Sequence, residues 1–128
     1  MKIQHFKPSL VTKSFFPEYD DVAIINHGEC FIWAYAAFMM FEGIELWYNG
    51  CHAFVRYRGR FYDSEVLRGS RDWADLPATE GGGVPIQVPV SKFRLDWGGN
   101  PREFNTSWKE VESRARKALR RYRTKKDM

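Results

Sequence analysis

The residues best suited to chemistry in this chain are one cysteine, one histidine and a pair of acids. Cys30 opens an apolar run whose spacing predicts a helix, and His52 and Asp63 lie on opposite arms of a predicted hairpin. A cysteine nucleophile needs a thiolate, which a helix N-terminus and an imidazolium both favour, and a third group that orients the imidazole. We therefore expect Cys30 to act as nucleophile, His52 as base and Asp63 as the group that orients His52.

The predicted hairpin brings two carboxylates to the face that carries His52. Its strands are expected over 51–57 and 60–66, with Arg58-Gly59 as the turn. A two-residue turn pairs residues whose numbers sum to 117, as those of Arg58 and Gly59 do, so Glu65 faces His52 and Asp63 is its diagonal neighbour. Asp63 is favoured because it lies further from the fraying strand end, and Glu65 stays open as the alternative.

The same residues have plainer interpretations. The hairpin could be an ordinary half-exposed sheet edge, and Cys30 a small hydrophobic residue that fills the start of a helix. Strand alternation turns Cys51 away from His52, which predicts a structural role. For the same reason a zinc site made from His27, Cys30, Cys51 and His52 is disfavoured. A Cys30–Cys51 disulfide is disfavoured as well, because it would require an oxidising compartment. We expect no metal and no cofactor.

The elements that would position these residues suggest one α+β domain over 1–128, with its core in 22–97. The apolar residues of Cys30–Glu42 predict a central helix that is hydrophobic on nearly every side. Weak strands are expected over 84–90, as an edge because it contains two prolines, and over 92–97. Residues 1–25 give no clear element beyond a short buried strand or helix entry at 21–25.

The C-terminal segment predicts an amphipathic helix from about 107 to 123. Ser107 and Glu110 form a capping box, and an apolar stripe follows at Trp108, Val111, Ala115, Leu119 and Tyr122. The formal charge of +4 is concentrated here, since nine basic and three acidic residues in 109–128 give +6 and leave −2 for the rest. Nonspecific binding of nucleic acid is one interpretation of this helix, and a solvated face, with Arg114, Lys117, Arg120 and Arg121 lying mostly off the stripe, is the other.

Residues 26–76 resemble the core of the papain-like and transglutaminase-like superfamily of Cys-His-Asp enzymes, in strings also seen in small phage proteins. The resemblance rests on Gly28-x-Cys30 at a helix start and on His52-Ala-Phe-Val-x-x-x-Gly59-x-x-Tyr-Asp63, followed by an aromatic-acid-Leu-Pro stretch near Trp73. It implies a papain-like fold and a cysteine peptidase, amidase or deamidase that acts on a protein or peptide. Catalytically inactive members that bind a protein are the alternative that the family offers.

Two departures from the family concern stabilisation of the oxyanion. Phe54 stands where many transglutaminase-like members have Trp, and no glutamine precedes Cys30 at the spacing found in papain. We expect the backbone N–H of Cys30 to be one donor and the side chain of Asn26 or His27 to be the second. Asn26 could instead be a loop residue that caps the helix.

The sequence also bears on location. The longest apolar run, from Cys30 to Phe41, ends before the ~18–20 residues of a membrane span. The N-terminus lacks the continuous apolar region of a signal peptide. With a composition of 44% hydrophobic residues we expect a globular cytoplasmic protein without membrane association.

Overall fold

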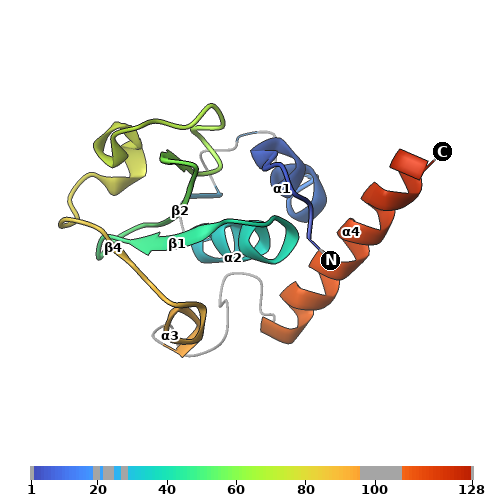
Figure 1. The fold of residues 1–128 in the computed structure, drawn as a ribbon. Helices are drawn as coiled ribbons and strands as arrows, with labels where there is room; N and C mark the ends of the chain where they lie inside the picture. The colour runs from blue at the N-terminus through green and yellow to red at the C-terminus, as the bar shows by residue number, and fades with distance from the viewer. Residues whose placement is uncertain (1, 19–20, 22–24, 27–28, 96–107, 128) are drawn as a thin grey trace.

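A computed structural model shows an α+β architecture in which a buried helix lies against a small antiparallel sheet (Figure 1). It describes residues 2–18, 21, 25–26, 29–95 and 108–127. The α-helices of these residues are α1 (Pro8–Phe15), α2 (Cys30–Met40), α3 (Val90–Leu95) and α4 (Trp108–Asp127). The strands are β1 (Glu45–Tyr48), β2 (Ala53–Tyr57), β3 (Arg60–Tyr62) and β4 (Ile86–Gln87), and two 3₁₀ turns, η2 (Trp73–Asp75) and η3 (Pro77–Thr79), precede β4.

Helix α2 is central because almost none of its surface is polar. Most of its side chains are buried, and the helix packs against β1 and β2 on one side and against α1 and α4 on another. The helix predicted over Cys30–Glu42 is confirmed, but it ends at Met40 and Gly43 follows with a left-handed φ of 77°. Packing on several sides fixes the N-terminus of α2, and with it the position of Cys30.

The predicted hairpin register is confirmed. Val55 pairs with Tyr62 and Tyr57 with Arg60, so the paired numbers sum to 117 as expected. The turn residues Arg58 and Gly59 both have positive φ, 49° and 81°, which is the backbone of a type I′ turn. The sheet order is β3-β2-β1-β4.

The predicted strands 51–57 and 60–66 are too long at the ends that carry the candidate site. The side chain of Asn49 accepts the backbone N–H groups of Cys51 and His52, and that of Asp63 accepts those of Glu65 and Val66. Backbone donors that are satisfied by a nearby side chain do not extend a ladder. The hairpin strands therefore begin at Ala53 and end at Tyr62.

Several elements differ from the sequence prediction. The strand predicted over 92–97 is wrong, because Val90–Leu95 is helix α3 and buries Phe93 completely. The edge strand expected over 84–90 is reduced to Ile86–Gln87. Helix α1 and strand β1 were not predicted, and the core begins before residue 22, since Val11 and Phe15 of α1 are fully buried. Most of the segment 21–25 lies outside the described residues.

Helix α4 docks through its apolar stripe onto α2 and α1. Trp108, Val111, Ala115 and Leu119 are buried, as the sequence predicted, although the helix continues to Asp127 and Ser107 lies outside the described residues. Arg114 is half-buried, and its Nη2 donates to the backbone oxygen of Phe15 at 3.1 Å. None of the described helices combines the length and hydropathy of a membrane span.

Candidate functional site

The centre of the site is a buried pair formed by His52 and Asp63. His52 directly precedes β2 and Asp63 directly follows β3, so the two side chains meet at the open end of the hairpin. His52 Nε2 lies 3.0 Å from Asp63 Oδ2, and each side chain is only 1% exposed. The buried imidazole is therefore held by one carboxylate.

The carboxylate of Asp63 is itself fixed by the backbone that follows it. Its Oδ1 accepts the N–H groups of Glu65 at 2.9 Å and of Val66 at 2.8 Å. Glu65, the alternative orienter, supplies only this backbone donor, and its side chain is exposed. Among the described residues Asp63 is the acid that contacts His52.

Asn49 supports the other side of the histidine, a role that the sequence analysis missed. This residue is 4% exposed, and its Oδ1 accepts the backbone N–H of His52 at 3.0 Å. Its Nδ2 donates to the backbone oxygen of Thr79 at 2.9 Å. A Cβ at Gly82 would lie 2.5 Å from this Nδ2, so only glycine fits there. The Asn49-Gly50 pair shortly before His52 is a sequence signal for a turn closed by the asparagine side chain. No sequence signal indicates the hydrogen bond from Asn49 to Thr79.

Cys30 lies at the first residue of α2 and is 5% exposed. Burial is the largest influence on the pKa of His52 and lowers it, but the hydrogen bond to Asp63 and the neighbouring side chain of Cys30 together raise that pKa from 6.5 to about 9. His52 Nδ1 is buried and has no hydrogen bond of good geometry. Because Asp63 occupies Nε2, Nδ1 is the ring nitrogen left for the thiol.

Asn26 offers a further donor near the hairpin end. Its Oδ1 accepts the hydroxyl of Ser64, the residue after Asp63, at 3.0 Å. Its Nδ2 is buried and has no partner among the described residues. The side chain of Asn26 is thus tied to the hairpin, and the residue at the N-cap of α2, Glu29, makes no side-chain capping bond. The alternative second donor, His27, lies outside the described residues.

Cys51 has a different environment from Cys30. Its thiol is exposed and lies 3.4 Å from Asn49 Oδ1 and 3.6 to 3.8 Å from the backbone oxygens of Ala78, Thr79 and Glu80. Both cysteines are free. The described part of the chain contains no group of three or more His, Cys, Asp or Glu residues that could hold a metal ion.

Comparison of the chain with protein families, with curated proteins and with solved structures gives no match. The chemistry of the site therefore has to be argued from its own residues.

Proposed function

We propose that this protein is a cysteine-dependent hydrolase or acyl transferase that acts on amide-type bonds. The observation that carries the proposal is the buried His52, bonded through Nε2 to a fixed Asp63 and influenced by the side chain of Cys30. A thiol, an imidazole and a carboxylate in this order are the minimal parts of an activated cysteine nucleophile. We extend the proposal to a papain-like fold, supported by a cysteine at the start of a buried helix beside an antiparallel sheet.

Each of the three residues has a defined role in the proposed reaction. The Cys30 thiolate attacks the carbonyl carbon of the amide, and the electron pair of the carbonyl moves to its oxygen. Protonated His52 gives its proton to the leaving amine, and the carbon–nitrogen bond breaks to leave a thioester on Cys30. Neutral His52 then takes a proton from water or from an acceptor amine, which attacks the thioester; the carbon–sulfur bond breaks and the Cys30 thiolate is released beside protonated His52. Asp63 keeps the imidazole oriented and stabilises its protonated form.

The backbone N–H of Cys30 and the Nδ2 of Asn26 are the proposed donors to the oxyanion. A buried amide nitrogen without a partner costs folding free energy. Asn26 carries such a nitrogen among the described residues. A developing oxyanion would satisfy this donor only during the reaction.

The proposal is tested by the reactivity of the two thiols. Cys51 is exposed and Cys30 is buried, so accessibility alone predicts faster alkylation of Cys51. If protonated His52 stabilises a thiolate at Cys30, iodoacetamide at pH 6–7 alkylates Cys30 first, as measured by peptide mass spectrometry of the folded protein. We expect His52→Ala to abolish the faster alkylation of Cys30. In protein unfolded by guanidinium chloride, the two thiols should be alkylated at similar rates. A folded protein in which Cys30 reacts no faster than Cys51 contradicts the proposal.

Turnover requires a second measurement, because an inactive protein-binding relative could retain a reactive thiol. A library of fluorogenic peptide amides is incubated with the protein and with the Cys30→Ala variant. Release of the fluorophore by the former alone supports hydrolysis. A reactive Cys30 that cleaves none of the library and transfers no acyl group to added amines favours the binding role.

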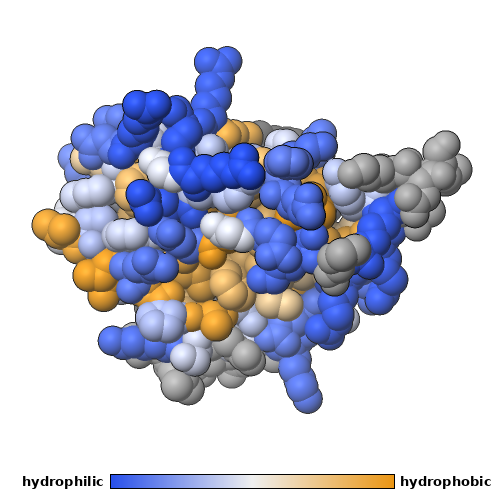
Figure 2. Space-filling model, in the orientation of Figure 1, coloured by the Kyte–Doolittle hydropathy of each residue, from blue (hydrophilic) through white to orange (hydrophobic). Residues whose placement is uncertain are grey.

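A second candidate function is favoured by the surface of α4. Figure 2 shows hydrophilic residues where α4 crosses the visible face, and Arg116, Lys117 and Arg121 of this helix are exposed. We propose that this face binds polyanions such as nucleic acid without sequence preference. Changing these three residues to Gln should weaken DNA binding. The plot of log K against log salt should also become less steep by about 2–3 units of slope, near 0.9 for each lost phosphate contact. An unchanged slope contradicts this role.

A further inference from the structure

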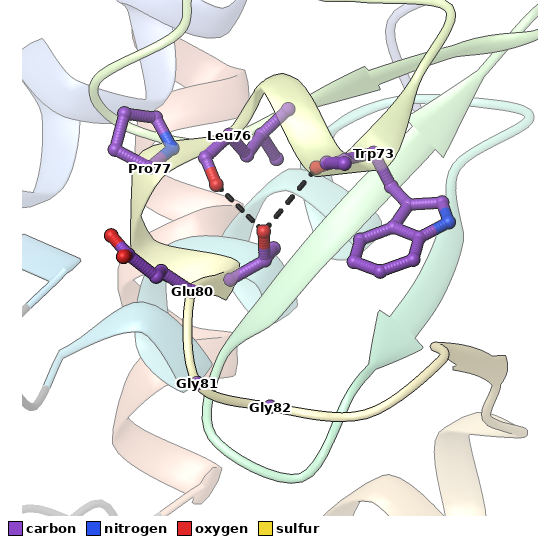
Figure 3. A pocket seen from close by; sticks show the side chains of 8 residues that line it. Trp73, Leu76, Pro77, Glu80, Gly81 and Gly82 are labelled. Carbon is purple, nitrogen blue, oxygen red and sulfur yellow. Dashed lines mark hydrogen bonds between the residues drawn. The ribbon is translucent and has the colours of Figure 1, made fainter.

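A pocket of about 330 Å³ lies in the segment between the hairpin and β4 (Figure 3). Its walls come from η2, η3 and the glycines that follow them. This volume is at the lower end of the ~300–1,000 Å³ typical of ligand pockets, which suits one side chain of a larger substrate.

The walls of the pocket are fixed by internal hydrogen bonds. The hydroxyl of Thr79 donates to the backbone oxygen of Leu76 at 2.7 Å, and it lies 3.5 Å from that of Trp73, as the dashed lines in Figure 3 mark. The side chain of Asp72 accepts the N–H of Ala74 at 3.0 Å at the start of η2. A preformed pocket loses little conformational entropy when a ligand binds.

Asn49 connects this pocket to His52. One end of its amide accepts the backbone N–H of His52, and the other donates to the backbone oxygen of Thr79 in the pocket wall. Gly82, also in the wall, packs directly on the same amide, and Gly83 donates its N–H to the backbone oxygen of Asn49 at 2.8 Å. Asn49 is therefore the one residue that separates the pocket wall from the backbone of the proposed base, His52.

The chemistry of the lining favours a cation on an aliphatic stem. Glu80 is the one charged residue that lines the pocket, its side chain is exposed, and no ion pair to it is found within the described ranges. Figure 3 shows Glu80 and the Trp73 indole on opposite sides of the pocket. An indole face attracts an ammonium or guanidinium group, and the exposed ring of Pro77 offers apolar surface to methylene groups.

We propose that this pocket is a subsite for a lysine or arginine side chain next to the bond that Cys30 attacks. The inference rests on the proposed function, since it names the substrate class of the same site. The cation would lie near Glu80, and the stem would lie along the apolar wall. The protein would then select amide bonds in basic peptide segments.

The experiment compares two peptidyl chloromethyl ketones that differ only in lysine or norleucine at the variable position. Cys30 Sγ attacks the methylene carbon of either probe and chloride leaves, so mass spectrometry gives the rate of adduct formation. One exposed ion pair together with an indole contact predicts about 5-fold faster labelling by the lysine probe. Glu80→Gln should reduce this preference to less than about 2-fold, because it slows labelling by the lysine probe more than labelling by the norleucine probe.

Glu18→Gln is the matched control, because it removes an exposed acid that does not line the pocket. The preference should persist in this variant. Equal rates for the two probes in the unchanged protein, or a preference that survives Glu80→Gln, overturn the subsite. Failure of both probes and of iodoacetamide to label Cys30 ahead of Cys51 overturns the proposed function itself.

Binding can be measured without chemistry in the Cys30→Ala variant. Saturation-transfer NMR with N-acetyl-lysine methylamide should give a signal that the norleucine analogue gives more weakly. Adding Glu80→Gln should remove the difference. A signal that is independent of Glu80 would contradict the subsite whatever the reactivity of Cys30.

Discussion

Two ion pairs border the same hairpin, and they differ in burial far more than in geometry. His52 and Asp63 lie 3.0 Å apart and are each 1% exposed. Arg56 of β2 and Glu45 of β1 lie 3.2 Å apart, with side chains that are 38% and 35% exposed. Water can therefore solvate the second pair and is excluded from the first.

The difference in burial bears on whether each ion pair stabilises the fold or has another role. Taking two charges out of water costs several kcal/mol per ion, so a buried pair adds little net stability even when its geometry is good. An exposed pair costs little and contributes little. The His52–Asp63 pair is thus poorly explained as a stabilising contact, and its perturbed histidine is typical of a functional site.

Breaking the buried pair should give the largest effect. Asp63→Ala leaves His52 without its partner at Nε2 and releases the backbone donors of Glu65 and Val66. We expect a loss of about 3–5 kcal/mol in the free energy of unfolding, measured by urea denaturation at pH 7. Alkylation of Cys30 should also slow, because the imidazole loses the group that raises its pKa.

Glu65→Gln is the control for this change. Its side chain is exposed, and it contributes to the site only through its backbone N–H, which the substitution keeps. Stability should change by less than about 0.5 kcal/mol. A loss as large as that of Asp63→Ala would mean that the carboxylate of Glu65 orients His52 in solution.

Removing the support of the buried pair should have the next largest effect. Asn49→Ala deletes the acceptor of His52 N–H and the donor to Thr79, both in buried surroundings. A loss of about 2–3 kcal/mol in unfolding free energy is expected, since buried partners are left unsatisfied. Ser70→Ala, which removes an exposed hydrogen bond to Asp75, should cost less than about 1 kcal/mol. Similar losses for both variants would show that Asn49 is not a buried support.

The contact between His52 and Asp63 follows from local rules. A two-residue turn fixes the register of the hairpin, and the register puts the acid on the diagonal of the histidine. The central helix was also predictable, because its composition leaves it no solvated face. These features depend on residues that are close together in the chain.

The remaining features depend on distant partners. Helix α1 contains several Ser, Thr and Val residues, which form helices poorly, and the burial of Val11 and Phe15 against the rest of the core stabilises it. Helix α3 is similar, because Phe93 is fully buried and the other residues of 90–93, for which burial is described, are not. The bond from Asn49 to Thr79 spans 30 positions. No local pattern contains this information, so the pocket was missed with it.

The pH dependence of stability should distinguish the buried pair from the exposed one. The pKa of His52 is about 9 in the folded protein and 6.5 for the free side chain. A raised pKa stabilises the fold fully below pH 6.5, and this contribution is lost as pH rises through 9. The unfolding free energy should therefore fall by on the order of 2–3 kcal/mol between pH 6.5 and 9.

His52→Gln should remove most of this fall, because glutamine does not titrate. NMR titration of the His52 ring gives the pKa directly, and Cys30→Ala should lower it, since the Cys30 side chain raises it. A titration midpoint near 6.5 in the unchanged protein would contradict the coupling of His52 to both neighbours.

The exposed pair should give the smallest effect. Glu45→Gln and Arg56→Gln, alone and together, form a double-mutant cycle whose coupling energy we expect to be about 0.2–1 kcal/mol at low salt. Both charges are partly solvated, so 0.5 M NaCl should reduce this coupling, whereas the buried pair should keep its effect on His52. The cycle is measured by urea denaturation. A coupling above about 2 kcal/mol that salt does not reduce would show that exposure does not separate the two pairs, and burial would then not distinguish His52 and Asp63 from an ordinary surface pair.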